Sequence, residues 1–192
     1  APTSGAVRIG DLSITKKTLP DIRRTVGLVF QDPDDQLFMP TVGDDVAFGP
    51  LNLGLPADDV ESRVAGALER VGAGALRTRP PYRLSSGEKR AAAIASVLSM
   101  SPDILALDEP SAGLDPAARR RLIGLLRSFE HTKIVATHDL DLVMDVCART
   151  IVLREGRVAA DGPTEAVFSD VSLLRASQLE RPLRLQGCPR CG

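Results

Sequence analysis

Short apolar runs along the chain alternate with longer stretches in which apolar residues recur every three or four positions. Strand-like runs lie at residues 26–30, 104–107, 134–136 and 151–153, with weaker candidates at 7–9 and 157–160. Because most of these runs are almost continuously apolar, we expect strands that are covered on both faces, as in a parallel sheet. The pattern therefore predicts a buried sheet with helices between its strands.

Helical patterns occupy the segments between these runs. Apolar residues at helical spacing follow Pro56, and an alanine-rich helix is predicted from about Gly87 to Met100. A third helix begins after Asp115 as its N-cap, and a fourth begins near Asp139. Strands that alternate with helices predict an α/β fold with a mostly parallel sheet. The Pro- and Gly-punctuated insert from 33 to about 82, together with the helix after it, predicts a helical subdomain at approximately 33–100.

Composition and charge narrow the class of protein. The 192 residues have a net charge of −1, a mean hydropathy of zero and 43% hydrophobic residues, which is typical of a globular domain rather than a disordered chain. There is no basic excess and only 3% of residues are aromatic, so we expect no nucleic acid as partner. No apolar run reaches the roughly 18–20 residues that cross a bilayer, and we see no secretory signal. Three cysteines fit a reducing compartment.

A pair of carboxylates follows the apolar run at 104–107. Asp108 and Glu109 come at the carboxyl end of this predicted strand, the edge at which parallel sheets bind ligands. Asp108 is placed to hold Mg²⁺, and Glu109 is placed to polarise a water molecule for attack on a γ-phosphate. The alternative is a solvated strand end, because Asp-Glu pairs are common.

Further polar residues follow the other predicted strands and begin one helix. Ser85 and Glu88 have the spacing of a capping box, and a helix start with hydroxyls and a glycine is also an anion site. Gln31 comes directly after the run at 26–30, and His138 comes after the run at 134–136. A lone Gln or His at such a position is more often structural, so the argument depends on their combination.

The motifs occur in an order that resembles the nucleotide-binding subunits of ABC transporters. Along the chain these are Gln31, then LSSGEKR at 84–90, ILALDEP at 104–110, SAGLD at 111–115 and THD at 137–139. The resemblance extends from Ala1 to about Phe168 and implies a P-loop NTPase-like ABC ATPase core over 1–168. The remaining 169–192 are expected to form a C-terminal helix and a flexible tail.

The resemblance implies ATP and Mg²⁺ as cofactors and gives three residues a catalytic part. Glu109 would be the catalytic base, and His138 would contact the γ-phosphate. Gln31 would link Mg²⁺ and the γ-phosphate to a membrane partner. Asp108 and Gln31 would be the metal ligands.

The remaining matched residues would serve the nucleotide that a second ABC ATPase subunit holds. These signature and D-loop residues are Ser85, Ser86, Gly87, Glu88 and Asp115. The common signature is LSGGQ, so Ser86 and Glu88 replace Gly and Gln here. Because Ser85 and Gly87 are kept, we expect the signature to function despite that departure.

A finer resemblance is to the ATPase subunits of energy-coupling-factor importers. It is carried by GLVFQDPDDQLF at 27–38 and DVAFGPLNLG at 45–54, and the segments at 84–89 and 137–142 look most like the cobalt/nickel branch. This implies a peripheral subunit on the cytoplasmic face of the cell membrane, in which ATP-driven dimer closure powers uptake through integral membrane subunits. The dimer partner would be an identical copy or a paralogue. The apolar insert at 32–56 would dock on the membrane subunit or, alternatively, fill a small satellite core.

The phosphate-binding loop of this family, G-x-x-x-x-G-K-[ST], has no match here, because the chain contains no Gly-Lys pair. We expect this loop just upstream of residue 1, so the N-terminal part of the domain would be missing by truncation or by natural loss. The alternatives are a catalytically silent dimer partner, the ATPase of a vitamin-type importer, or an ABC ATPase of DNA repair or translation. Cys188 and Cys191 form a lone C-x-x-C, which supplies only two metal ligands.

Overall fold

The computed structural model describes residues 4–186, which fall into two compact units. The first unit is Ala1–Ala136 and the second is Thr137–Gly192. Cys188 and Cys191 lie outside the described residues. None of the helices within 4–186 is long and apolar enough to span a membrane.

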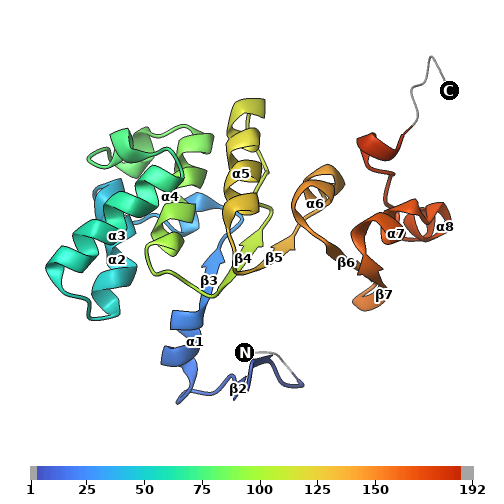
Figure 1. Ribbon diagram of the computed structural model, residues 1–192, viewed down its shortest axis with the longest axis horizontal. Coiled ribbons are helices and arrows are strands. Elements are labelled where there is room, and N and C mark those ends of the chain that lie inside the picture. Colours follow the sequence, from blue (N-terminus) through green and yellow to red (C-terminus); the bar gives the residue numbers. More distant parts are fainter. Residues whose placement is uncertain (1–3, 187–192) are drawn as a thin grey trace. The chain divides into compact units, whose positions relative to one another are not determined.

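A three-stranded parallel sheet forms the centre of the first unit (Figure 1). Its strands are β3 (Val26–Val29), β4 (Ile104–Asp108) and β5 (Thr132–Ala136), in the order β3-β4-β5. Val29 pairs with Leu107 and Asp108 pairs with Ala136, so the three strands end at the same edge. The strands expected at 26–30, 104–107 and 134–136 are confirmed, and so is the parallel sheet.

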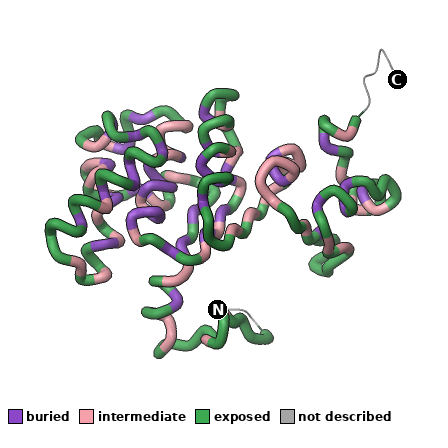
Figure 2. The backbone as a smooth tube through the Cα atoms, viewed as in Figure 1, coloured by how far each residue is buried: buried purple, intermediate pink, exposed green. Residues whose placement is uncertain are grey.

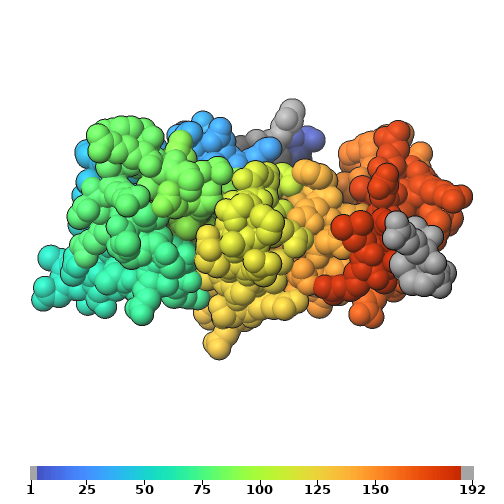
Figure 3. Space-filling view, turned by 90° about the horizontal axis from the view of Figure 1, so that it is seen from above, coloured from blue at the N-terminus to red at the C-terminus, as the bar shows by residue number. Residues whose placement is uncertain are grey.

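Helices and short turns make up the rest of the first unit. They are α1 (Leu19–Thr25), η1 (Pro33–Asp35), α2 (Val42–Asn52), α3 (Ala57–Arg70), η2 (Gly74–Leu76), η3 (Pro81–Arg83), α4 (Ser86–Leu98) and α5 (Pro116–Ser128). A short antiparallel pair, β1 (Arg8–Ile9) with β2 (Leu12–Ser13), precedes them. Figure 3 shows the surface of α2, α3 and α4 in cyan and green and that of α5 in yellow.

Helix α4 connects the sheet to the helical segment, because it packs on β3, α2 and α3. Its residues Ala92, Ala93 and Ile94 are buried, and Figure 2 shows buried positions concentrated where these helices meet. The approach of α4 to β3 requires a glycine: a Cβ on Gly27 would lie 2.2 Å from Cγ1 of Val97. The sequence of the sheet is thus adapted to the helix that carries the LSSGEKR motif.

One face of the parallel sheet is not covered as expected. Val29 and Leu107 point into the core, whereas Leu28 is 50% exposed and Ile134 is 57% exposed within the described residues. The expectation of strands covered on both faces was therefore wrong for this part of the chain. Successive residues of a strand alternate between its faces, and an apolar run does not tell whether the same stretch of chain supplies both covering layers.

The second unit contains an antiparallel hairpin and short helices. Its elements are α6 (Leu140–Val146), β6 (Arg149–Arg154), β7 (Arg157–Pro163), α7 (Thr164–Ser169), α8 (Val171–Ala176) and η4 (Leu183–Leu185). The strand expected at 151–153 pairs antiparallel with the strand expected at 157–160, so neither of them extends the parallel sheet. The reason is the two-residue turn at Glu155 and Gly156, whose positive φ angles of 50° and 73° suit a tight hairpin.

Candidate functional site

An open cleft of about 870 Å³ lies at the carboxyl edge of the parallel sheet in the first unit. Gln31 enters it from the end of β3, Asp108 from the end of β4, and Ser86 from the start of α4. These three residues are far apart in the sequence, and the parallel register of β3 and β4 brings the first two to one edge. Gln31, Asp108 and Ser86 are exposed, so polar groups can meet a ligand there.

Glu109 follows β4 in a strained backbone conformation. Its φ of 42° lies in the left-handed region, which residues other than glycine rarely adopt. The Glu109 amide donates to the carbonyl of Ala136 at the end of β5 over 2.8 Å, and its carbonyl accepts from Ala112. These two bonds hold the turn after the strand. A carboxylate kept half-buried in a strained turn is the kind of outlier that points to a functional position.

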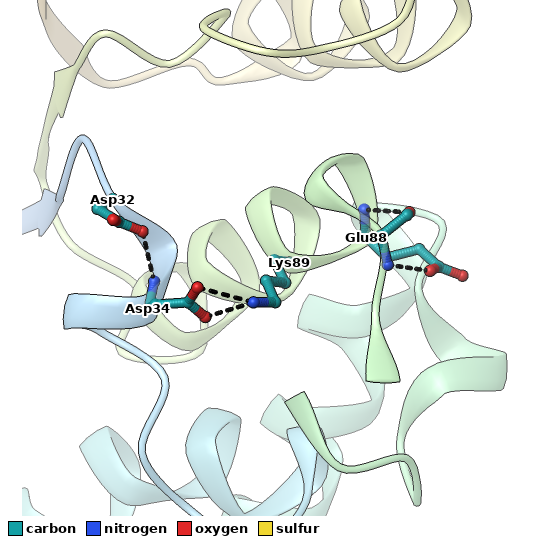
Figure 4. Close-up of polar contacts among 5 residues, drawn as sticks. Asp32, Asp34, Glu88 and Lys89 are labelled. Atoms are coloured by element: carbon teal, nitrogen blue, oxygen red, sulfur yellow. Dashed lines mark hydrogen bonds and ion pairs between the residues drawn. The ribbon is translucent and has the colours of Figure 1, made fainter. Parts of the chain in front are cut away.

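The predicted capping box at the start of α4 is confirmed (Figure 4). The Glu88 amide donates to the Ser85 hydroxyl oxygen over 3.3 Å, and the Ser85 amide donates to a Glu88 carboxylate oxygen over 2.8 Å. This backbone donor lowers the pKa of the Glu88 carboxyl below its ordinary value. The hydroxyl of Ser85 accepts in the box, and its hydrogen bond to the Glu88 carboxylate lowers the same pKa further.

Ser86 and Gly87 touch the turn at 111–115, which the sequence assigned to the D-loop. The Ser86 hydroxyl donates to the Gly113 carbonyl over 3.3 Å. A Cβ on Gly87 would lie 3.3 Å from the Cβ of Ala118 in α5, so a side chain there would be tight. Glycine at position 87 therefore has a packing reason besides any approach to a phosphate. The structure brings the signature and D-loop segments of one chain together.

Asp115 caps α5, as the sequence predicts. Its Oδ1 accepts from the amides of Ala117 and Ala118 over 2.8 Å and 2.9 Å, and these donors lower the pKa of its carboxyl. This cap contact explains an aspartate at 115 without a ligand. The role of Asp115 toward a second subunit stays a prediction.

His138 belongs to the second unit, directly before α6. Asp139 caps that helix by accepting from the Leu142 amide over 2.9 Å, and its own amide donates to the Thr137 hydroxyl. His138 is exposed and makes contacts of its own. Its expected role at the γ-phosphate stays a prediction.

Arg90 is a residue of the cleft that the sequence pattern did not single out. It is 4% exposed, and its guanidinium donates to the carbonyls of Phe30 and Gln31 over 2.8 Å and 2.7 Å. Burial lowers its pKa, while the charges of Asp32 and Asp108 oppose that change. The signal was present in the sequence: an arginine in an alanine-rich helix face that is otherwise buried needs polar partners.

The donor set in the cleft fits Mg²⁺. Asp108 offers a carboxylate and Gln31 an amide oxygen, and Mg²⁺ usually takes one or two protein oxygens while phosphates and water supply the others. Within residues 4–186 no group of three or more His, Cys, Asp or Glu side chains is gathered for a metal. The two oxygen donors of Asp108 and Gln31 fit a metal that a phosphate also coordinates.

Comparisons with known proteins show what the whole chain is similar to. The family model described as "AAA domain, putative AbiEii toxin, Type IV TA system" matches residues 14–145. The chain is 70% identical to an ABC transporter ATP-binding protein of Geobacter sulfurreducens, over 100% of this chain and 77% of that protein. It is 47% identical to the energy-coupling factor transporter ATP-binding protein EcfA of Methanocaldococcus jannaschii, over 94% of this chain and 67% of that protein.

Solved structures share the same fold. CbiO1 of Clostridium perfringens, described as part of an ABC transporter complex, is 42% identical with a TM-score of 0.74, over 84% of this chain and 66% of that one. The ATP-binding cassette MJ0796, solved as a dimer with ADP and phosphate, is 25% identical with a TM-score of 0.75. The second alignment covers 85% of this chain and 75% of that one. The chain belongs to the family of ABC transporter ATP-binding proteins.

Proposed function

We propose that this chain is the ATP-hydrolysing subunit of a membrane importer for a transition metal ion, cobalt or nickel. The observation that carries the proposal is the cleft at the carboxyl edge of the sheet, which gathers Gln31, Asp108 and Ser86 from two strand ends and one helix start. Family membership supports ATP as the ligand of that cleft. The subunit would be peripheral, on the cytoplasmic face of the membrane.

Each residue then has one task in the reaction. Mg²⁺, when bound, would neutralise charge on the phosphates, with Asp108 and Gln31 as its protein ligands. Glu109 would orient a water molecule and take up its proton as that water attacks the γ-phosphorus, while the bond from this phosphorus to the bridging oxygen breaks and ADP leaves. His138 would contact the γ-phosphate.

The signature would act on the nucleotide of a second subunit. The Ser85 hydroxyl and the first amides of α4 would donate to that subunit's ATP, and Asp115 would lie at the dimer interface. ATP would thus close two subunits on each other, and hydrolysis would reopen them. The second subunit is either an identical copy or a paralogue.

An aromatic patch on the helical segment supports docking to a membrane subunit. Phe38 is 64% exposed and Leu51 is 58% exposed, and the ring of Phe38 packs edge-on against Phe48 at 4.9 Å between centroids. The backbone amide of Phe38 is fixed, since it donates to the buried Asp45 carboxylate over 3.0 Å. The patch (Phe38, Phe48 and Leu51) is therefore held in place before any partner binds.

Other apolar residues of the same insert fit the alternative role, which is to fill a small satellite core. Leu37, Val42 and Val46 are buried, and α2 packs on α4. Burial favours the satellite-core role for these residues, and exposure favours the docking role for the patch. We infer that docking uses the exposed patch and that the satellite core supports it.

The cargo is inferred from resemblance at 84–89 and 137–142, and CbiO1 adds support as a transporter component of similar fold. The test is uptake of labelled cobalt and nickel by cells with and without the intact gene, with a vitamin as the control cargo. Loss of metal uptake alone supports the proposal. Loss of vitamin uptake alone would contradict the metal assignment and favour a vitamin-type importer.

A silent dimer partner is the second candidate, favoured by the lack of a Gly-Lys pair in these 192 residues. The encoding DNA distinguishes the two functions. An in-frame Gly-Lys-Ser/Thr loop within about 40 codons before Ala1 supports the ATPase, because an upstream segment of that length can hold the loop. A stop codon in that interval would contradict it.

A further inference from the structure

The backbone that carries Gln31 is linked to the signature helix α4 by hydrogen bonds from a buried arginine. The guanidinium of Arg90, in the second turn of α4, donates to the carbonyls of Phe30 and Gln31 over 2.8 Å and 2.7 Å. Two donors of one planar group thus hold two successive carbonyls, which fixes orientation as well as distance. Gln31 is held here through its main chain, so its side chain can still face the cleft.

A second contact holds the same segment from the other side. The Phe30 amide donates to Oε1 of Gln36 over 3.0 Å, and Nε2 of Gln36 donates to the Ala93 carbonyl in α4 over 2.7 Å. Nε2 also donates to the Ser96 hydroxyl over 3.0 Å. The amide and the carbonyl of Phe30 are therefore each fixed, through different side chains, to one helix.

Burial makes the Arg90 contact hard to lose. Arg90 is 4% exposed, and its Nε has no hydrogen-bond partner among the described residues. A buried guanidinium that gave up the two carbonyls would leave a charge without partners, which is strongly unfavourable. The neighbouring ion pair between Lys89 and Asp34 (Figure 4) has an N–O distance of 2.6 Å, is more exposed and adds less.

We propose that Arg90 is a positioning residue that makes the Gln31 segment and the signature helix move as one body. This inference rests on the proposed ATPase function and goes beyond it. Gln31 would serve the nucleotide of its own subunit, and Ser85 at the start of α4 would serve the nucleotide of the partner. Movement of α4 toward the partner's ATP would thus also move Gln31. Arg90 would in this way couple the two nucleotide-binding sites of a dimer.

Hydrogen exchange on the 192-residue chain tests the bridge without any ATPase activity. Arg90→Met should raise amide exchange within residues 30–36 by about tenfold or more, while the β4 and β5 amides keep the exchange rates of the parent. Arg90→Lys, which can reach only one carbonyl at a time, should lie between Arg90→Met and the parent. The matched control is Arg63→Met, because Arg63 also donates twice, to Ser99 and Ser101 at the other end of α4. It should leave residues 30–36 unchanged.

An activity measurement on the protein with its phosphate-binding loop separates positioning from mere stability. Arg90→Lys should lower kcat and raise the Mg²⁺ concentration for half-maximal rate several-fold, with the KM for ATP little changed.

Amide exchange at residues 30–36 that stays at the parental rate, or that rises equally throughout the first unit, would overturn the proposed link between Gln31 and α4. If the parent has no ATPase activity, the proposed function fails, and the exchange result still decides the mechanical link. If Arg90→Met does not fold, Arg90→Lys and Gln36→Leu replace it, and each should raise amide exchange within residues 30–36.

Discussion

Glu109 combines a left-handed φ of 42° with a position directly after β4. If it is the catalytic base, Glu109→Gln in the protein with its phosphate-binding loop should lower ATP turnover by roughly 10²–10⁴-fold, because the amide cannot accept the proton. ATP binding should persist, so ATP-bound dimers should accumulate. Phosphate release measures the turnover, and size-exclusion chromatography with ATP measures the dimers. Unchanged turnover would remove Glu109 from the role of base.

Gly27 shows how one residue sets the distance between β3 and α4. A Cβ there would lie 2.2 Å from Cγ1 of Val97 and 3.0 Å from Cγ of Pro102, and neither side chain is flexible. Gly27→Ala should therefore lower the free energy of unfolding by about 1–3 kcal/mol, as overpacking does. Urea unfolding measures this change.

A second variant, Val97→Ala, removes the Cγ1 atom that a Cβ at position 27 would clash with. The double variant Gly27→Ala with Val97→Ala should be more stable than the sum of the two single changes predicts, because the alanine methyl fills space that valine left. Additive effects would show that the close approach of α4 does not depend on this glycine.

At the residue scale, spacing predicted polar contacts between near neighbours. The capping box of Ser85 with Glu88 and the N-cap Asp115 are confirmed, because helix starts need acceptors within three residues. The bonds from Arg90 to Phe30 and Gln31 join positions about 60 residues apart. Such a contact depends on the packed fold, and no local pattern encodes it.

At the scale of elements, the predicted strands and helices were found close to their expected limits. The helix expected from Gly87 begins at Ser86 and ends at Leu98, and the strand expected at 134–136 extends back to Thr132. Length, β-branching and caps carry this information. Whether a strand face is covered depends on other elements, which explains why the exposure of Leu28 and Ile134 was not predicted.

The start of α4 gives a stability prediction with a defined pH dependence. Ser85→Ala should lower the free energy of unfolding by about 1 kcal/mol through loss of the cap. Glu88→Gln should cost less, and its cost should depend on pH. Because the folded pKa of Glu88 lies below its ordinary value of 4.5, the ionised carboxylate stabilises the fold above that value. This contribution is lost as the pH falls through the folded pKa.

Urea unfolding of parent and Glu88→Gln from pH 3 to pH 7 measures this contribution. The difference in unfolding free energy should be constant above about pH 5.5 and shrink at lower pH. Asp170→Asn is a matched control, since Asp170 caps α8 in the second unit and its pKa is lowered as well. A difference for Glu88→Gln that grows as the pH falls would contradict the capping interpretation.

The docking prediction concerns the loop before α2, which contains Phe38, and α2 itself, which contains Leu51. Phe38→Glu and Leu51→Glu should detach the membrane subunit, because each places a charge in the exposed aromatic patch, and they should leave ATPase activity away from the membrane unchanged. The matched control is Val158→Glu on β7, a residue of similar exposure in the second unit. Co-purification with the membrane subunits measures docking. Membrane subunits that still co-purify with folded Phe38→Glu and Leu51→Glu variants would contradict docking through this patch.

At the scale of the whole molecule, the proposed function depends on groups that different parts of the chain supply. The first unit contains Gln31, Asp108, Glu109 and the signature, and the second unit begins with the segment of His138. The order of these motifs identified the family although no single motif would have been sufficient. Each of these residues lies at the end of a strand or the start of a helix. The order of strands and helices along the chain therefore sets the order of the motifs.

The residues that cradle phosphates decide what these 192 residues can do by themselves. A Gly-Lys loop normally supplies backbone amides and a lysine to the β- and γ-phosphates, and the chain has no Gly-Lys pair. Residues 1–192 alone should therefore bind ATP weakly and hydrolyse it slowly, although Asp108, Glu109 and the signature are in place. A protein extended by the upstream codons should gain activity if they encode the loop. Equal and robust hydrolysis by both would show that the phosphate site lies elsewhere in the chain.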